Sequence, residues 1–152
     1  MLYNTLWLRF IAVFIDNLFL LPLVLLGGSG ADKSFSIVAA MVILLDHSYF
    51  IIGHAQYGRT IGKRLMGLKV VSAHKHLPIT WMQAIQRELM WILLSIVYTF
   101  FWVNPENFLT MLPGMALITA DTMLAAIHPQ NRSLRDFIAR TVVIRHRDIQ
   151  VE

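Results

Sequence analysis

The chain has 152 residues, of which 57% are hydrophobic and only 14% charged, and its mean hydropathy is +0.60. Soluble domains carry about 25% charged residues, so this composition favours a membrane protein. A net charge of +4 would suggest nucleic acid as the partner of a soluble chain, but in a membrane protein basic residues set topology, and we expect no nucleic-acid partner. The absence of cysteine excludes disulfides, thiolate metal sites and thiol catalysis.

Four apolar stretches predict four membrane-spanning helices. They cover residues 6–28, 35–55, 81–103 and 108–127. An α-helix needs about 20 apolar residues to cross the hydrocarbon core, which the first, second and fourth stretches provide. The third apolar run is shorter, but Thr80 and Gln83 have the spacing of a capping box and predict a helix start just before it. The first stretch lacks the basic start and cleavage site of a signal peptide, so we expect it to remain in the protein.

The basic residues predict the orientation. Ten of the thirteen lysines and arginines lie in the loop 56–80 or in the tail 128–152. Lysine and arginine accumulate on the cytoplasmic side of membrane proteins, so this loop, this tail and both chain ends are predicted to be cytoplasmic. The loop 56–80 contains no acidic residue. Four of its basic residues are predicted to act at the membrane surface or in binding a partner: Arg59, Lys63, Arg64 and Lys69.

The Gly62-Lys63 pair resembles the end of a nucleotide-binding P-loop, but the spacing is wrong. Such a loop needs four residues between its first glycine and the Gly-Lys pair, followed by Ser or Thr. Only three residues separate Gly58 from Gly62, and Arg64 stands where the hydroxyl should be. We expect no nucleotide here. The cations of the loop either contact anionic headgroups, at about 1 kcal/mol each, or only enforce the topology.

The segment GRTIGKRLMGLKVV (58–71) fits the pattern G-x-T-x-G-K-x-hydrophobic-x-G-x-x-V. Together with Arg9, Asp16 and Asp136, it resembles the RDD family of bacterial membrane proteins, named after one arginine and two aspartates. Arg87 and the closing Ala139, Thr141 and Val143 extend this resemblance over residues 9–144. It implies a multi-pass protein of the bacterial inner membrane with a role in transport. Ile61 and Arg135 depart from the commoner proline or leucine and histidine, so no titrating histidine precedes Asp136.

Three aspartates, Asp16, Asp46 and Asp121, lie inside apolar stretches. An aspartate at mid-membrane costs roughly 2.5–3.5 kcal/mol, so each needs a partner or a proton. At a rise of about 1.5 Å per residue, the three lie about 9–14 Å from the cytoplasmic helix ends and could share one layer. Together with Asn17 they predict a proton or monovalent-cation site. The alternative is that protonated aspartates hydrogen-bond across helices and only stabilise the bundle.

Two further contacts are predicted on the cytoplasmic side. Arg9 points away from Asp16 along its helix, and Asp136 is its expected partner in an ion pair. The short β-branched segments LKVV (68–71) and TVVI (141–144) are expected to pair, because neither forms a stable strand alone. The predicted fold is therefore an all-α membrane protein, a four-transmembrane-helix bundle with a small cytoplasmic two-stranded β element, in a single domain over 1–152.

No enzyme, cofactor or metal is predicted. His74 and His76 lack a third metal ligand, and Asp46, His47 and Ser48 are adjacent on a helix and therefore point in different directions. The leading hypothesis is transport of a small solute or of a cation or proton through the carboxylate layer, favouring a homo-oligomer because one copy offers few helices. The alternative is a membrane scaffold whose basic cytoplasmic face binds a protein partner or anionic lipid.

Overall fold

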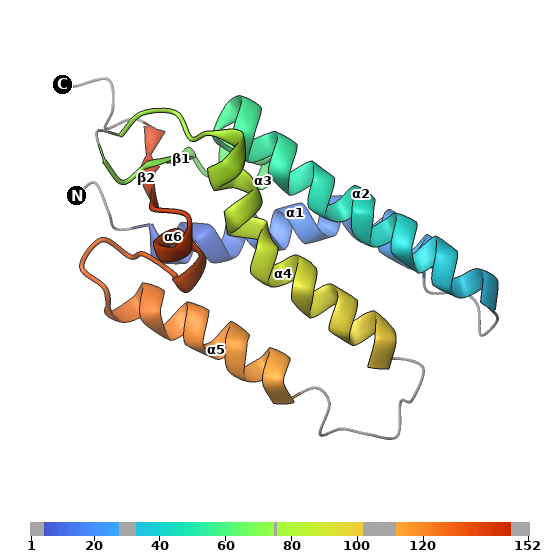
Figure 1. Ribbon diagram of the computed structural model, residues 1–152. Coiled ribbons are helices and arrows are strands. Elements are labelled where there is room, and N and C mark those ends of the chain that lie inside the picture. Colours follow the sequence, from blue (N-terminus) through green and yellow to red (C-terminus); the bar gives the residue numbers. More distant parts are fainter. Residues whose placement is uncertain (1–4, 28–32, 75, 102–111, 147–152) are drawn as a thin grey trace.

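The computed structural model describes residues 5–27, 33–74, 76–101 and 112–146 (Figure 1). Four long helices dominate it, and two short helices and two strands complete it. The elements are α1 (Leu6–Gly27), α2 (Lys33–Tyr57), α3 (Ile61–Leu65), β1 (Leu68–Ser72), α4 (Trp81–Phe101), α5 (Leu112–Ile127), α6 (Leu134–Ile138) and β2 (Thr141–Arg145). The four long helices occupy the predicted stretches; the predicted ends at 28, 102–103 and 108–111 lie outside the described residues.

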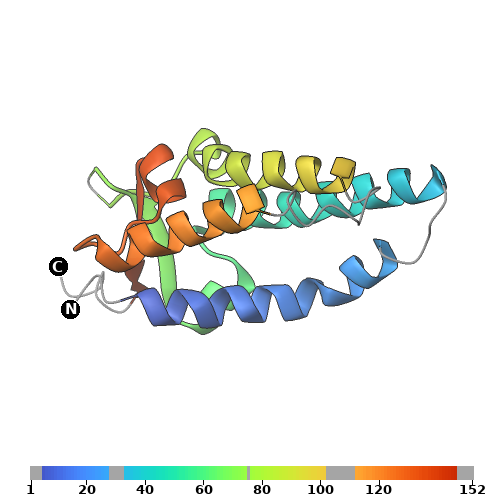
Figure 2. The same ribbon diagram turned by 90° about the horizontal axis from the view of Figure 1, so that it is seen from below.

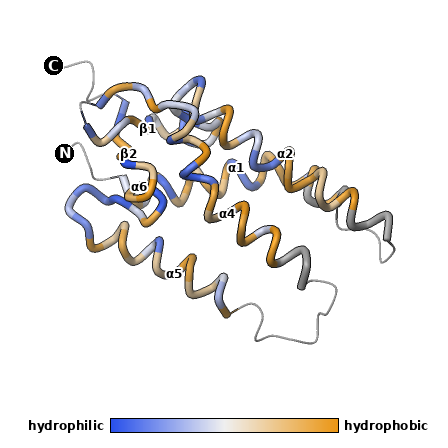
Figure 3. The backbone as a smooth tube through the Cα atoms, viewed as in Figure 1, coloured by the Kyte–Doolittle hydropathy of each residue, from blue (hydrophilic) through white to orange (hydrophobic). Residues whose placement is uncertain are grey.

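The long helices run side by side, and the sheet, α3 and α6 gather at one end of them (Figures 1 and 2). The beginning of α1 lies at this same end, which we call the sheet end. Polar residues concentrate there, whereas the rest of the helices is mostly apolar (Figure 3). The polar and apolar parts of the molecule are thus separated along the helix axes.

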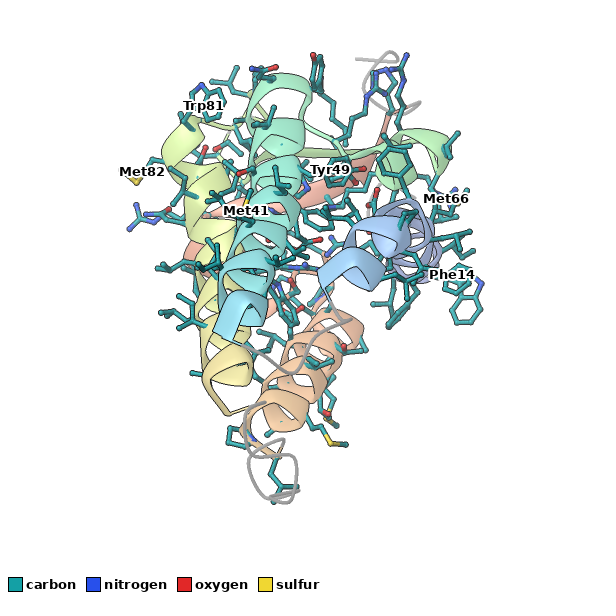
Figure 4. The ribbon with its side chains drawn as sticks, turned by 90° about the vertical axis from the view of Figure 1, so that its right-hand side faces the viewer. Phe14, Met41, Tyr49, Met66, Trp81 and Met82 are labelled. Atoms are coloured by element: carbon teal, nitrogen blue, oxygen red, sulfur yellow. The ribbon has the colours of Figure 1, made fainter. Side chains whose placement is uncertain are left out.

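Within the described residues, two helices contain segments long and apolar enough to cross a membrane, Leu6–Leu23 in α1 and Ile37–Tyr57 in α2. Helix α5 is apolar over 16 residues. Large apolar side chains point outwards, among them Phe14 at 69% exposure and Met82 at 63% (Figure 4). The core helix of a soluble protein would bury such side chains, so these exposed apolar faces fit a lipid environment.

The predicted strand pairing is confirmed. β1 and β2 are antiparallel, with Val70 opposite Val143 and Ser72 opposite Thr141. Residues 141–144 of β2 are all buried. One side of the sheet packs with Ala12 of α1 and Ala84 of α4. On the sheet, Val71, Val142 and Ile144 form a second apolar cluster. The predicted capping box at the start of α4 is also present: Thr80 and Gln83 exchange side-chain to backbone hydrogen bonds of 3.1 and 3.3 Å.

Candidate functional site

A cavity of about 430 Å³ lies between the four long helices and α6. Its volume falls in the range of about 300–1,000 Å³ that is typical of ligand sites. Three carboxylates line it, those of Asp46, Glu88 and Asp121. Its neutral polar lining includes Asn17, Ser95, Thr122 and Ser133, and its cations are Arg9 and Arg135. Apolar side chains thus form most of the lining, and the polar and charged groups named above are set among them.

Asp46 and Glu88 are the two lining carboxylates without an arginine partner among the described residues. Asp46 is half-buried on α2, and no hydrogen bond or ion pair joins it to another described residue. Glu88 is 3% exposed on α4 and lies between two imidazoles. Its Oε2 is 3.6 Å from Nδ1 of His47, and its Oε1 is 3.8 Å from Nδ1 of His54. These two carboxylates are the groups best placed to bind a cation or a proton.

Asp121 is held by Arg135. The backbone N–H of Arg135 donates to its Oδ1 at 3.1 Å, and Nε of Arg135 lies 3.7 Å from its Oδ2. The Arg135 guanidinium also lies 5.7 Å from the ring centre of Trp91, another lining residue. Arg135 thus places a positive charge beside one of the cavity's carboxylates.

Asp16 does not line the cavity, and the prediction that it shares one site with Asp46 and Asp121 is corrected. It is fully buried against α3, where its carboxylate accepts hydrogen bonds from Tyr49 Oη at 2.7 Å, Thr60 Oγ1 at 2.6 Å and Gly62 N at 2.8 Å. Tyr49 reaches it from α2 (Figure 4). Adjacent residues on a helix point about 100° apart, so Asn17 faces the cavity when Asp16 faces α3.

Lys63 is not at the surface, and its predicted contact with headgroups is also corrected. It is 4% exposed, and its Nζ lies 2.5 Å from Nε2 of His54. Burial lowers the pKa of Lys63 well below its usual value, and the nearby charges of Arg87 and Arg135 lower it further. Of the other predicted surface cations, Arg64 is exposed, while Arg59 and Lys69 are half-buried. The short helix α3 turns its lysine inwards and Arg64 outwards.

The predicted ion pair between Arg9 and Asp136 is present, with Nη1 and Oδ2 2.7 Å apart. Asp136 is completely buried and also accepts a hydrogen bond from Arg87, which in turn contacts Thr141. Burial raises the pKa of Asp136, but the guanidiniums of Arg87 and Arg9 prevail and hold this pKa well below its usual range. One carboxylate therefore joins the beginning of α1, α4 and the segment before β2.

Sequence reasoning missed Glu88, His47 and His54 as site residues, and it matched Arg87 to the family without giving it a partner. Two signals were available. Glu88 is an acidic residue at the start of an apolar stretch, and His47 and His54 are seven residues apart, which places them on one face of α2. Only the packing of α2 against α4 shows that Glu88 lies between the two imidazoles.

Comparison with known proteins agrees with these observations. The model of the RDD family matches residues 3–140. An uncharacterized protein of Haemophilus influenzae is 28% identical over 137 residues, which cover 90% of this chain and 74% of that protein. No solved structure matches. The matched range covers most of the chain and includes Arg9, Asp16 and Asp136, and the chain belongs to the RDD family.

Proposed function

We propose that this protein transports a monovalent cation or a proton across the bacterial inner membrane through the cavity between its long helices. The observation that carries the proposal is the pair of carboxylates, Asp46 and Glu88, that face this cavity without an arginine partner among the described residues. Charged groups inside apolar helices cost free energy, so their position at a cavity is typical of ion and proton pathways. Hydroxyl, amide and carboxylate oxygens are ligands that suit hard cations.

The proposal includes a topology of four membrane crossings, α1, α2, α4 and α5, with the sheet end in the cytoplasm. Its support is the charge pattern, because ten of the thirteen lysines and arginines lie in segments 56–80 and 128–152, from which the sheet end is largely built. Because one copy has only four long helices, we include a homo-oligomer in the proposal. A scaffold that docks through its basic face is less well supported, because Lys63 is buried rather than exposed.

The test is ion flux in proteoliposomes. We expect purified protein in vesicles of phosphatidylethanolamine and phosphatidylglycerol to move protons, Na⁺ or K⁺, and Asp46→Asn to lower this flux at least ten-fold. Thr122→Val, in the cavity, should also lower it, whereas Thr119→Val is a matched control because Thr119 is exposed on the same helix and does not line the cavity. Absence of flux from the wild-type protein for all three ions would refute the proposal.

A further inference from the structure

A row of buried ionisable side chains leads away from the cavity. Glu88 and His47 line the cavity, whereas His54 and Lys63 lie beyond it and do not. The exposed fractions of these four residues are between 1% and 7%. They come from three elements, α2, α4 and α3, and α3 belongs to the sheet end. The row therefore connects the cavity with the polar end of the molecule.

Each member of the row lies close to the next. Lys63 Nζ is 2.5 Å from His54 Nε2, and His54 Nδ1 is 3.8 Å from Glu88 Oε1. On the other side, Glu88 Oε2 is 3.6 Å from His47 Nδ1, and His47 Nε2 is 3.0 Å from Ser95 Oγ. Both imidazoles thus have one nitrogen toward Glu88 and the other toward a further polar group. An imidazole used through both nitrogens can accept a proton on one side and release one on the other.

The two nitrogens that face Glu88 have no hydrogen bond. Nδ1 of His47 and Nδ1 of His54 are buried, and neither has a hydrogen-bond partner among the described residues. An unsatisfied buried polar atom destabilises a folded protein, so two of them facing the same carboxylate are unfavourable in a cluster that serves only to stabilise the fold. The gaps of 3.6 and 3.8 Å can be bridged by a water molecule or closed by side-chain rotation when a proton passes.

We infer that Lys63, His54, Glu88 and His47 form a proton relay between the cavity and the sheet end. This inference rests on the proposed transport function and names the proton as the ion that leaves the cavity by this route. Asp46 lies outside the row: it lines the cavity and makes no ion pair with a member of the row.

The transfer steps conserve protons and charge. His47 receives a proton on Nε2 from the cavity and releases the one on Nδ1 to the Glu88 carboxylate, which becomes a neutral acid. Glu88 gives this proton to His54 Nδ1, and His54 releases the proton on Nε2 to the neutral amine of Lys63. The resulting ammonium passes the proton to water. Both rings then carry their proton on the opposite nitrogen, and a ring flip restores them. One proton moves, and no electron is transferred.

The charges around the row favour the neutral amine that this route needs. Lys63 is surrounded by cations of two elements, Arg87 on α4 and Arg135 on α6, and by the carboxylates of Glu88 and Asp136. Burial and the two arginines lower the pKa of Lys63, so its amine can accept a proton from His54. Asp46 is the additional charged group beside His47.

The experiment measures proton flux with an internal pH dye, with the voltage clamped by valinomycin and K⁺. We expect Lys63→Met and His54→Gln each to lower this flux at least ten-fold. Because relay members act in series, the double variant should be no slower than the slower single variant.

Lys69→Met and His74→Gln, the same substitutions at half-buried and exposed positions outside the row, should keep the wild-type flux. A wild-type protein that also exchanges ²²Na⁺ for Na⁺ should keep this exchange in Lys63→Met, because it needs no net proton movement. A helical circular dichroism spectrum like that of the wild type shows that each variant is folded.

The outcomes separate the two proposals. If Lys63→Met and His54→Gln have the same proton flux as the wild-type protein, the relay is overturned and the transport function is not. The relay would also be overturned by flux losses that add up in the double variant, since that is the pattern of two independent structural effects. Absence of proton, Na⁺ and K⁺ flux from the wild-type protein would overturn the transport function and the relay together, and flux of Na⁺ or K⁺ without proton flux would overturn the relay alone. If one variant fails to fold, Glu88→Gln replaces it with the same expected loss.

Discussion

The backbone of Gly62 lies directly against the backbone of Ala12, so that α3 is seated on α1 at the Asp16 carboxylate. A Cβ atom at position 62 would lie 2.1 Å from the carbonyl oxygen of Ala12 and 2.9 Å from Cγ of Asp16. The same glycine donates its N–H to Asp16. The Gly-Lys pair of the 58–71 segment therefore has a steric role: its glycine permits the close approach, and the approach directs Lys63 inwards toward His54.

Gly62→Ala should destabilise the protein by about 1–3 kcal/mol or more, because the obstructing atoms are backbone and cannot rotate away. Thermal unfolding in detergent measures the effect. Gly53→Ala is the matched control: its Cβ would meet its nearest neighbour at 3.4 Å, and alanine favours helix, so this variant should be as stable as the wild type. Equal melting temperatures for the two variants would contradict the observed seating of α3.

Asp16→Asn should lower stability by about 1–3 kcal/mol. The Asp16 carboxylate accepts three hydrogen bonds, and the asparagine amide would replace one of its accepting oxygens with an NH₂ group that can only donate. Since Asp16 does not line the cavity, ion flux per folded molecule should stay near the wild-type value, in contrast to Asp46→Asn. Flux normalised to folded protein in the vesicles checks this. An Asp16→Asn variant of normal stability that carries no ions would place Asp16 in the transport pathway instead.

The Asp136 carboxylate should make stability depend on acid. Its pKa in the folded protein lies below that of the unfolded chain, so its stabilising contribution is fully present above the unfolded pKa of about 3.9 and is lost as the pH falls from there toward the folded pKa. Asp136→Asn should cost about 3–5 kcal/mol near neutral pH, because it leaves Arg9 and Arg87 buried without a counter-ion.

The measurement for Asp136 is the melting temperature between pH 3 and pH 7. The difference between wild type and Asp136→Asn should be constant above about pH 5 and should shrink on acidification. Thr141→Val is a milder comparison, because it removes a contact of Arg87 and keeps both ion pairs of Asp136. A wild-type to Asn difference that is independent of pH would contradict the ionised state of Asp136.

The proposed orientation can be tested by labelling, because the chain has no cysteine of its own. Arg64→Cys and Arg140→Cys introduce thiols at exposed positions of the sheet end. In intact cells a membrane-impermeant maleimide should label neither, and in inverted vesicles it should label both. Leu112→Cys, at the opposite end of the long helices, should show the reverse pattern. Labelling of position 64 or 140 from outside the cell would show that the orientation is the opposite of the proposed one.

The sequence by itself determined the elements that rest on local or one-dimensional patterns. Hydropathy located the long helices, the Thr80 and Gln83 spacing located the start of α4, and β-branched residues located the two strands. The ion pair of Arg9 with Asp136 was also predictable, because the Arg9 side chain leans away from Asp16 along α1 and Asp136 follows the last long helix on the same predicted side.

Only the tertiary structure decided which ionisable groups share a site. Depth along a helix can be counted from the sequence, but the direction in which a side chain points depends on how the helices are rotated against each other. That rotation turns Asp16 toward α3 and Asn17 toward the cavity, brings Glu88 between His47 and His54, and places Arg135 on Asp121. Likewise, the fit of Gly62 against Ala12 buries Lys63, a charge that its neighbours in the sequence would place at the surface.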